Sequence, residues 1–275
     1  MILVNKYLAV GTVVVVFFGL LIGTALILVP NDNSTDQKPE IIIEKNFLYY
    51  DGVNITWLGV AAFKLKTQDL LVYIDPYLLT NDAEKADIVV ATHDHYDHLS
   101  VPDIQIIADA NTKLFTPKPV HIDQFGTALD EVESLNVKEI YYTKPWDNIK
   151  ESGITLEFVP AYNDNHPRDA NWTGVIVDFG NVRVYHAGDT AHIPEMKQID
   201  CDIAFIPILG TGLMSAEEGA EAVESLQVLS ELQFVIPMHY TYPFTIGNIT
   251  VGNLIEAEDF QERANCTVII LKPSF

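Results

Sequence analysis

Histidine and aspartate side chains are concentrated in one short segment of this chain, THDHYDHLS. Residues 92–100 hold three of the eight histidines and two aspartates: His93, Asp94, His95, Asp97 and His98. Neutral imidazole and carboxylate are the ligands that zinc and similar divalent metals prefer. In a loop, His93 and His95 can project to one side, while Asp97 and His98 are directed to a second point after a turn. The spacing therefore predicts two neighbouring ions, and a surface loop with incidental histidines explains this crowding poorly.

Three further candidate ligands lie alone elsewhere in the chain: His166, Asp189 and His239. Each ends an apolar run beside a turn-forming residue, in the segments NHP, AGDT and PMHY. Taken singly, such a residue is more often a hydrogen-bonded loop or core residue than a ligand. One divalent ion needs about four to six donors, however, and the histidine segment supplies too few for two ions. We therefore expect these three residues to complete the ligand set.

Short β-branched apolar runs predict the elements that position these residues. The expected buried strands fall within residues 54–60, 70–76, 86–93, 153–161, 171–180, 181–189, 201–209 and 233–240. The segment DFGNVR predicts a hairpin turn. A helix is expected to begin at Ser215, which forms a capping box with Glu218, and apolar residues recur at helical spacing from Ala216 to Leu229.

The strands form two blocks, each followed by helices, which suggests two sheets between helical layers. All of the polar segments that contain candidate ligands lie at strand ends. Loops beyond strand ends converge on one edge in layered α/β proteins, so residues distant in sequence can meet there. We therefore expect one site assembled at one edge of both sheets.

The first thirty residues differ from the rest. Residues 8–29 are 22 consecutive uncharged and mostly apolar residues, and a helix of that length spans about 33 Å, enough for a hydrocarbon core of about 30 Å. The alternative is a cleaved signal peptide, but its apolar region is usually about 7–15 residues long. We expect residues 1–29 to be a membrane anchor, residues 30–40 a linker, and residues 41–275 one soluble domain.

The charges that flank the apolar segment predict its orientation. Lys6 precedes it and acidic residues follow it, which favours a cytoplasmic N-terminus and an extracellular domain on a single-pass cell-membrane protein. Five N-x-S/T sequons agree with export if the host glycosylates them: Asn33, Asn54, Asn171, Asn248 and Asn265. Asn54 and Asn171 fall where strands are expected.

Composition restricts the partners of the chain. Its 38 acidic and 16 basic residues give a formal charge of −22, which repels phosphate backbones and argues against nucleic acid as a partner. We expect a small-molecule or lipid substrate instead, and the sequence leaves the oligomeric state open. Cys201 and Cys266 could pair in an oxidising compartment or remain two buried thiols.

Taken in order, the segments IDPY, THDHYDHLS, HAGDT and IPMHY resemble the metallo-β-lactamase superfamily. More narrowly, residues 52–245 are similar to metal-dependent hydrolases related to L-ascorbate-6-phosphate lactonase. The resemblance implies an αββα sandwich with the site along one edge of the two sheets. It also implies a first metal held by His93, His95 and His166, a second held by Asp97, His98 and His239, and Asp189 bridging them. Asp75 of IDPY matches an aspartate that orients the histidine loop.

One residue departs from this resemblance. Relatives commonly have LGHA or LGHS near the first strand, whereas this chain has LGVA, with Val60 in the histidine position. Any second-sphere or substrate role of that histidine is then lost or filled elsewhere. His121, His186 and His192 have no assigned role; His186 is expected to be buried in its strand, and His192 is a candidate to face the pocket.

The expected cofactors are two divalent ions, zinc or alternatively manganese. Two ions about 3.5–4 Å apart can share a water and lower its pKa from about 15.7 toward 7, which makes a bridging hydroxide available at neutral pH. Asp97 or Asp189 could pass a proton to the leaving group. The expected activity is hydrolysis of an ester, lactone, amide or phosphodiester, with ester and lactone favoured by the resemblance.

Other activities would use the same residues. A di-iron oxidoreductase usually has an acid at the position of His95, and a nuclease would need a basic approach surface that the charge of −22 does not provide. A phospholipase or phosphodiesterase acting on membrane lipids stays open, because the anchor would hold the site near a bilayer. A non-catalytic metal-binding protein also stays open.

Overall fold

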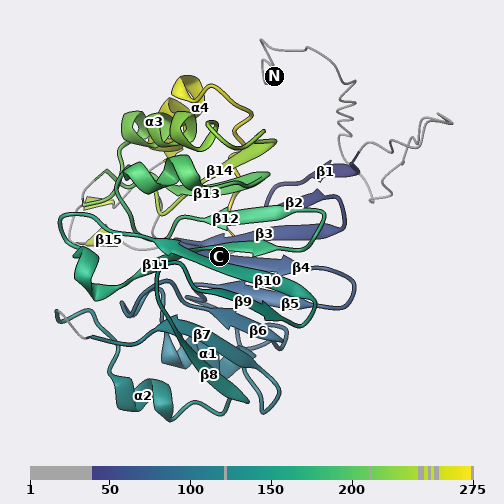
Figure 1. Ribbon diagram of the computed structural model, residues 1–275, viewed down its shortest axis with the longest axis vertical. Coiled ribbons are helices and arrows are strands. Elements are labelled where there is room, and N and C mark those ends of the chain that lie inside the picture. Colours follow the sequence, from purple (N-terminus) through teal and green to yellow (C-terminus); the bar gives the residue numbers. More distant parts are fainter. Residues whose placement is uncertain are drawn as a thin grey trace, which may run out of the picture. The chain divides into compact units, whose positions relative to one another are not determined.

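Two mixed β-sheets, stacked face to face, form the centre of the computed structural model (Figure 1). The structure describes residues 39–120, 123–210, 212–240, 245–246, 249–250 and 254–273. The predicted anchor, residues 1–29, and nearly all of the predicted linker lie outside these residues. Among the described residues, no helix combines the length and apolar character needed to cross a bilayer.

The first sheet places its strands in the order in which they occur along the chain. It contains β1 (Ile41–Ile43), β2 (Phe47–Tyr50), β3 (Val53–Gly59), β4 (Ala62–Lys66), β5 (Leu71–Ile74), β6 (Ile88–Val90), β7 (Lys113–Pro117) and β8 (Glu139–Thr143). Neighbours from β1 to β5 are antiparallel, and those from β5 to β8 are parallel. The carboxyl ends of β5 to β8 therefore share one edge of this sheet.

The second sheet has the spatial order β14-β13-β12-β11-β10-β9. Its strands are β9 (Asn148–Glu151), β10 (Ile154–Pro160), β11 (Thr173–Asp178), β12 (Arg183–His186), β13 (Ile203–Pro207) and β14 (Phe234–Met238). The predicted hairpin joins β11 to β12, where Gly180 has a φ of +92° that favours glycine. Strands β12, β13 and β14 are parallel, and a small ribbon pairs β15 (Thr245–Ile246) with β16 (Ile249–Thr250).

Helices lie beside both sheets (Figure 1). They are α1 (Val101–Ile107), α2 (Leu129–Glu133), α3 (Ala216–Leu226) and α4 (Leu254–Arg263), with short 3-10 helices η1 (Arg168–Ala170) and η2 (Pro194–Gln198). The capping box predicted for Ser215 and Glu218 is present at the start of α3. The helix ends at Leu226, however, so the prediction that it continues to Leu229 is wrong, and Leu229 is 57% exposed.

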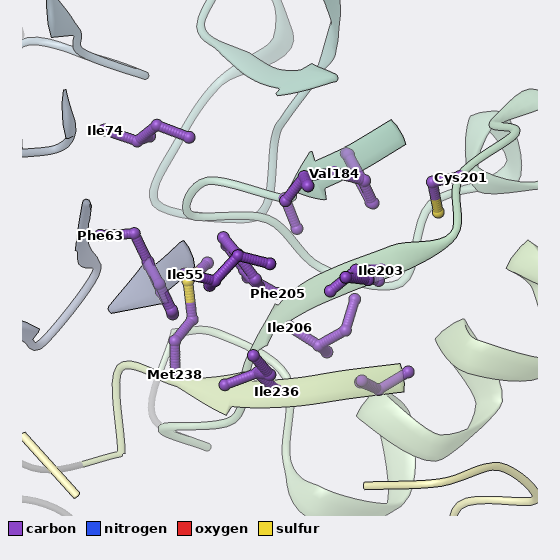
Figure 2. Packing of buried hydrophobic residues seen from close by; sticks show 14 of the residues in the cluster. Ile55, Phe63, Ile74, Val184, Cys201, Ile203, Phe205, Ile206, Ile236 and Met238 are labelled. Atoms are coloured by element: carbon purple, nitrogen blue, oxygen red, sulfur yellow. The ribbon is translucent and has the colours of Figure 1, made fainter. Parts of the chain in front are cut away.

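Both faces of the central strands are buried, which explains their uninterrupted apolar sequences. In β5, Val72 and Ile74 join the core between the sheets, whereas Leu71 and Tyr73 face a second cluster that includes residues of α1 and α2. Figure 2 shows the inner core, where Phe63 of the first sheet lies near Phe205 of the second. Their rings stack with centroids 3.8 Å apart.

Helices α3 and α4 pack against each other and contribute to the core on the side of the second sheet (Figure 1). The described residues thus form the predicted sandwich of two sheets between helical layers. All of the predicted candidate ligands follow strand ends: the histidine segment follows β6, His166 lies between β10 and β11, Asp189 follows β12 and His239 follows β14. This confirms the expected placement of the polar segments at strand ends.

Candidate metal centre

The structure brings the seven predicted ligand residues together. Each residue in a set offers one ligand atom, and these atoms lie within 4.8 Å of one another in three sets: His93, His95 and His166; His93, His98 and Asp189; and Asp97, His98 and His239. The sets overlap, because His93 and His98 each belong to two of them. The cluster is a His/Asp site suited to metal ions, and its donors come from both sheets.

His98 is oriented by Asp75, which follows β5. The Nδ1 atom of His98 lies 2.7 Å from Asp75 Oδ2, and both side chains are fully buried. Asp75 also accepts hydrogen bonds from the Thr92 amide at 2.7 Å and the Thr92 hydroxyl at 2.8 Å. A carboxylate beside Nδ1 favours the tautomer with its proton there, which leaves Nε2 free to act as a ligand. The expectation that Asp75 orients the histidine loop agrees with these contacts.

The other nitrogen of His98 faces the cluster. Its Nε2 atom lies 3.4 Å from Asp189 Oδ2 and 3.3 Å from His239 Nε2. Burial alone lowers the pKa of His98, but the carboxylates of Asp189, Asp75 and Asp97 outweigh burial and raise that pKa well above its ordinary value. Three carboxylates around one imidazole mark a place of concentrated negative charge. A divalent cation can compensate that charge in the same way as a proton.

His93 has the opposite electrostatic setting. Burial, together with the neighbouring imidazole of His98, holds the pKa of His93 well below its ordinary value. Its Nδ1 lies 3.1 Å from the Thr92 hydroxyl, while its buried Nε2 has no hydrogen-bond partner among the residues that the structure describes. Buried polar atoms are rarely left without a partner. A neutral imidazole with a buried lone pair is suited to metal ligation.

His166 is positioned by an Asx turn. The Asn163 side-chain oxygen accepts hydrogen bonds from the backbone amides of Asn165 at 2.8 Å and His166 at 3.0 Å. The imidazole ring then lies with its centroid 5.1 Å from that of His93 and 5.0 Å from that of His95. Burial lowers the pKa of His166 to about 4, so it is neutral at physiological pH.

Asp189 and His239 depend on unusual backbone positions. Gly188 before the aspartate has a φ of +65°, and a Cβ there would lie 2.9 Å from the Thr173 carbonyl oxygen. His239 itself has a φ of 60°, and its amide donates to the Val60 carbonyl oxygen at 2.8 Å. Such left-handed residues are rare outside glycine and concentrate at functional sites.

The carboxylate of Asp189 lies between two imidazoles. Its Oδ1 is 3.3 Å from His239 Nε2 and its Oδ2 is 3.4 Å from His98 Nε2. Burial raises the pKa of Asp189, but His239 and His98 outweigh burial, and the pKa is well below its ordinary value. Asp189 is therefore ionised. The Oδ2 atom of Asp97 completes this side of the cluster, 3.9 Å from the Nε2 atoms of both His98 and His239.

Sequence reasoning missed Trp172, which precedes β11. Its ring centroid lies 5.0 Å from those of His93 and His95 and 5.1 Å from that of His166. Trp172 is 3% exposed, and its Nε1 has no hydrogen-bond partner within the described part of the chain. No sequence signal separated it from a core tryptophan, since a single indole in an apolar run usually packs in the interior.

The first aspartate of the histidine segment, Asp94, has a different role from the second, Asp97. Asp94 is buried, its Oδ2 accepts from the Val120 amide at 2.7 Å, and its carbonyl oxygen accepts from the Thr127 amide at 2.6 Å. Asp94 thus fixes the loop that follows β7 onto the histidine segment. That loop also carries Asp123, whose Oδ2 lies 3.4 Å from His95 Nε2.

Among the described residues, the two histidines without a predicted role, His186 and His192, belong to none of the donor sets. His186 is buried in β12, as expected, with Nε2 on the Ala61 carbonyl oxygen at 2.8 Å. The Nε2 atom of His192 contacts the Ser225 hydroxyl of α3 at 2.8 Å, and the suggestion that His192 faces the pocket stays a prediction. His121 lies outside the described residues.

The cysteines and sequons can also be placed in part. Cys201 and Cys266 are free thiols, so the disulfide alternative is not realised in this structure. Asn54 lies in β3 as expected. The expectation of a strand at Asn171 is wrong, because this residue ends η1 with a left-handed φ of 58°, which asparagine tolerates. Asn33 and Asn248 lie outside the described residues.

Comparison with protein families places this fold and site in a known class. The family model for the Beta-lactamase superfamily domain matches residues 54–239 of the sequence. The two mixed sheets with a His/Asp cluster define a metallo-β-lactamase fold. Relatives from two organisms narrow the class. A UPF0173 metal-dependent hydrolase of Methanopyrus kandleri is 31% identical over 70% of this chain and 86% of its own. One of Koribacter versatilis is 31% identical over 81% of this chain and 96% of its own.

The chain belongs to the UPF0173 family of the metallo-β-lactamase superfamily and is a metal-dependent hydrolase. Solved structures agree with the fold. A Parabacteroides distasonis protein that carries the metal-dependent hydrolase designation has a TM-score of 0.63 at 25% identity, covering 86% of this chain and 99% of its own. Igni18, a metallo hydrolase of Ignicoccus hospitalis, has a TM-score of 0.62 at 22% identity, covering 80% and 95%.

Proposed function

We propose that this hydrolase cleaves an ester or lactone bond with two divalent ions, zinc or alternatively manganese. The ligands of the first ion are His93, His95 and His166, those of the second are Asp97, His98 and His239, and Asp189 is shared. The observation that carries this proposal is the overlap of the three donor sets, in which Asp189 groups with one histidine of each trio. A single ion would need only one such set.

The residues present fit such ions. Among the described residues, the buried Nε2 of His93 finds no hydrogen-bond partner, and three carboxylates surround His98. Imidazole nitrogen and carboxylate oxygen are common ligands for zinc and acceptable ones for manganese. When bound, the ions supply a water of lowered pKa and positive charge opposite the oxygen of the scissile bond.

The protein side chains supply orientation and proton transfer. Asp75 holds His98 with Nε2 toward the cluster, and Asn163 fixes the turn that presents His166. Asp97 and Asp189 are the candidate groups to pass a proton to the leaving oxygen. Asp97 is the more accessible of the two, with 14% of its side chain exposed against 8% for Asp189, so it is better placed to exchange that proton with solvent.

The choice of bond rests on charge and on the similarity to lactonase-related hydrolases. A chain with a formal charge of −22 repels polyanionic substrates, which disfavours nucleic acids. Carboxylic esters and lactones are uncharged at the reacting carbonyl and meet no such repulsion.

Metal analysis combined with turnover tests this proposal. The full chain, loaded with Zn²⁺ or Mn²⁺, is assayed against lactones, carboxylic esters and phosphodiesters, with bound metal measured by elemental analysis. His95→Ala and Asp189→Ala are each expected to abolish hydrolysis and to lower the metal content. His192→Gln is the matched control. Because His192 contacts α3 and belongs to none of the donor sets, this variant should retain both hydrolysis and the wild-type metal content. Full activity with two ions retained in either ligand variant would refute the assignment.

We also propose that residues 8–29 anchor the protein in the cell membrane with the catalytic domain outside. The support is the uncharged apolar segment and the charges that flank it. The native chain is then expected in the membrane fraction, and added protease should digest the domain on intact cells. Release of a protein that starts near residue 31 would instead establish a cleaved signal peptide.

A further inference from the structure

Aromatic side chains remain exposed beside the metal centre. Tyr96 and Phe125 are 45% and 46% exposed, and Tyr77 is half-buried next to them. The Tyr96 ring centroid lies 5.9 Å from that of Tyr77 and 6.2 Å from that of Phe125. We call these three residues the aromatic rim. Leu78, adjacent to Tyr77, is a further exposed apolar residue at 40%.

The rim is continuous with the ligand cluster. Tyr96 lies between the ligands His95 and Asp97, and the Phe125 ring centroid is 6.2 Å from that of His95. The Tyr96 amide donates to the Phe125 carbonyl oxygen at 2.9 Å, and His95 forms a β-bridge with Gly126. The histidine segment and the loop after β7 therefore hold both rings at the edge of the centre.

The chemistry of the rim restricts its occupant. The carboxylates of Asp97, Asp103 and Asp123 lie near the rim and disfavour an anionic group on it, while the imidazole of His98 lies on the side of the metal centre. Exposed aromatic rings gain free energy when an apolar group covers them. Contiguous exposed apolar residues beside a site are characteristic of ligand-binding surfaces.

We propose that the aromatic rim binds the uncharged alkyl or acyl chain of a soluble ester or lactone whose carbonyl lies at the metal centre. This inference rests on the proposed function, and it adds the substrate class. The rim selects esters with a chain of several methylene groups over acetates. A fully buried methylene contributes about fourfold to binding, and one that stays half in water about twofold. Four additional methylenes then predict a ratio of about sixteen.

The test compares kcat/KM for 4-nitrophenyl hexanoate and 4-nitrophenyl acetate. The zinc-loaded full chain is held in nanodiscs of uncharged lipid, so that every variant has the same lipid background. The wild type is expected to give a hexanoate to acetate ratio of about 16. Tyr96→Ser combined with Phe125→Ser should reduce that ratio to about 4 or less, since both rings lose their apolar surface.

Two further variants control for folding and for general surface effects. Phe125→Leu keeps an apolar side chain at this position and should retain most of the preference for hexanoate over acetate. Leu229→Ser removes a 57% exposed apolar side chain that precedes β14, whereas the candidate ligand His239 follows the other end of that strand. This variant should therefore leave the hexanoate to acetate ratio unchanged. Circular dichroism establishes that each variant is folded before its ratio is compared.

The outcomes separate this inference from the proposed function. An equal hexanoate to acetate ratio in the wild type and the double serine variant would overturn the proposal that the rim binds the alkyl or acyl chain, while leaving the proposal of ester hydrolysis intact. No turnover of any ester or lactone by the metal-loaded wild type overturns the proposed function instead. Saturation-transfer NMR with hexanamide then tests alkyl-chain binding to the rim without turnover. A signal that the double serine variant loses supports binding at the rim, and an equal signal in the wild type and the variant refutes it. Chain-length selectivity that is seen only for esters embedded in the nanodisc, and not for dissolved esters, also refutes the proposed binding at the rim.

Discussion

The substitution Asp75→Asn tests how the fold prepares His98 for metal. Asp75 is fully buried and accepts hydrogen bonds from Thr92 and His98. The asparagine side chain has the same shape, but its NH₂ group donates hydrogen bonds where one carboxylate oxygen of Asp75 accepts them. With its oxygen still on the Thr92 amide, the new NH₂ group faces Nδ1 of His98. That contact favours the tautomer protonated at Nε2, the nitrogen directed at Asp189 and His239.

The expected effect follows from the lost orientation of one ligand. Replacing the partner of a metal-binding histidine typically weakens affinity about 10- to 100-fold, which corresponds to about 1.4–2.7 kcal/mol. The hydrogen bond from a buried imidazole to a carboxylate contributes about 1.5–3 kcal/mol to folding, so the metal-free variant should also unfold more easily. Of the two proposed ions, only the second, to which His98 is assigned, should be affected strongly.

Calorimetric titration of the metal-free protein with Zn²⁺, in the presence of a competing chelator, measures both binding steps. One step should weaken by the amount given above while the other stays close to the wild type. Asp103→Asn is the matched control, because Asp103 is a buried carboxylate that accepts from the Leu79 amide at 2.7 Å and belongs to none of the donor sets. Wild-type affinity in both steps of Asp75→Asn would contradict the role of Asp75.

Three further outcomes follow from the site and its surroundings. Zn²⁺ should change the tryptophan emission of the wild type but not of Trp172→Phe, because the centroid of this indole lies 5.0 to 5.1 Å from those of three candidate ligand rings. Burial raises the pKa values of Cys201 and Cys266 to about 12, so both thiols should react about a thousandfold more slowly with Ellman's reagent at pH 8 than in urea. In the metal-free protein, His166 has a pKa of about 4 against an ordinary 6.5, so stability falls as the pH drops from 6.5 to 4. His166→Asn should remove about 3 kcal/mol of that fall in denaturant titrations.

The sequence predicted the central strands well because their two faces are both buried. Continuous β-branched runs such as that of β6 are hard to accommodate in anything but an interior strand. The antiparallel strands β1, β2 and β4 were not predicted from sequence. They are short, and β4 carries the lysines of AFKLK, so packing against neighbouring strands rather than their own composition determines them.

The limits of prediction at the site are also physical. Asp94 and Asp97 are chemically identical and three residues apart, yet the loop after β7 takes the Asp94 carboxylate and leaves that of Asp97 near His98 and His239. Spacing within a loop does not fix such directions. For the same reason, the contact of His192 with α3 could not be foreseen, because the position of that helix depends on tertiary packing.

The location of the donors links the site to the packing of the two sheets. The histidine segment is carried by β6 of the first sheet, and Asp189 and His239 follow β12 and β14 of the second. Neither sheet alone can assemble any donor set that includes Asp189 or His239. The apolar core between the sheets therefore holds these carboxylates and imidazoles beside one another. The free-energy cost of desolvating these groups is opposed by the burial of apolar residues such as Phe63 and Phe205 in that core.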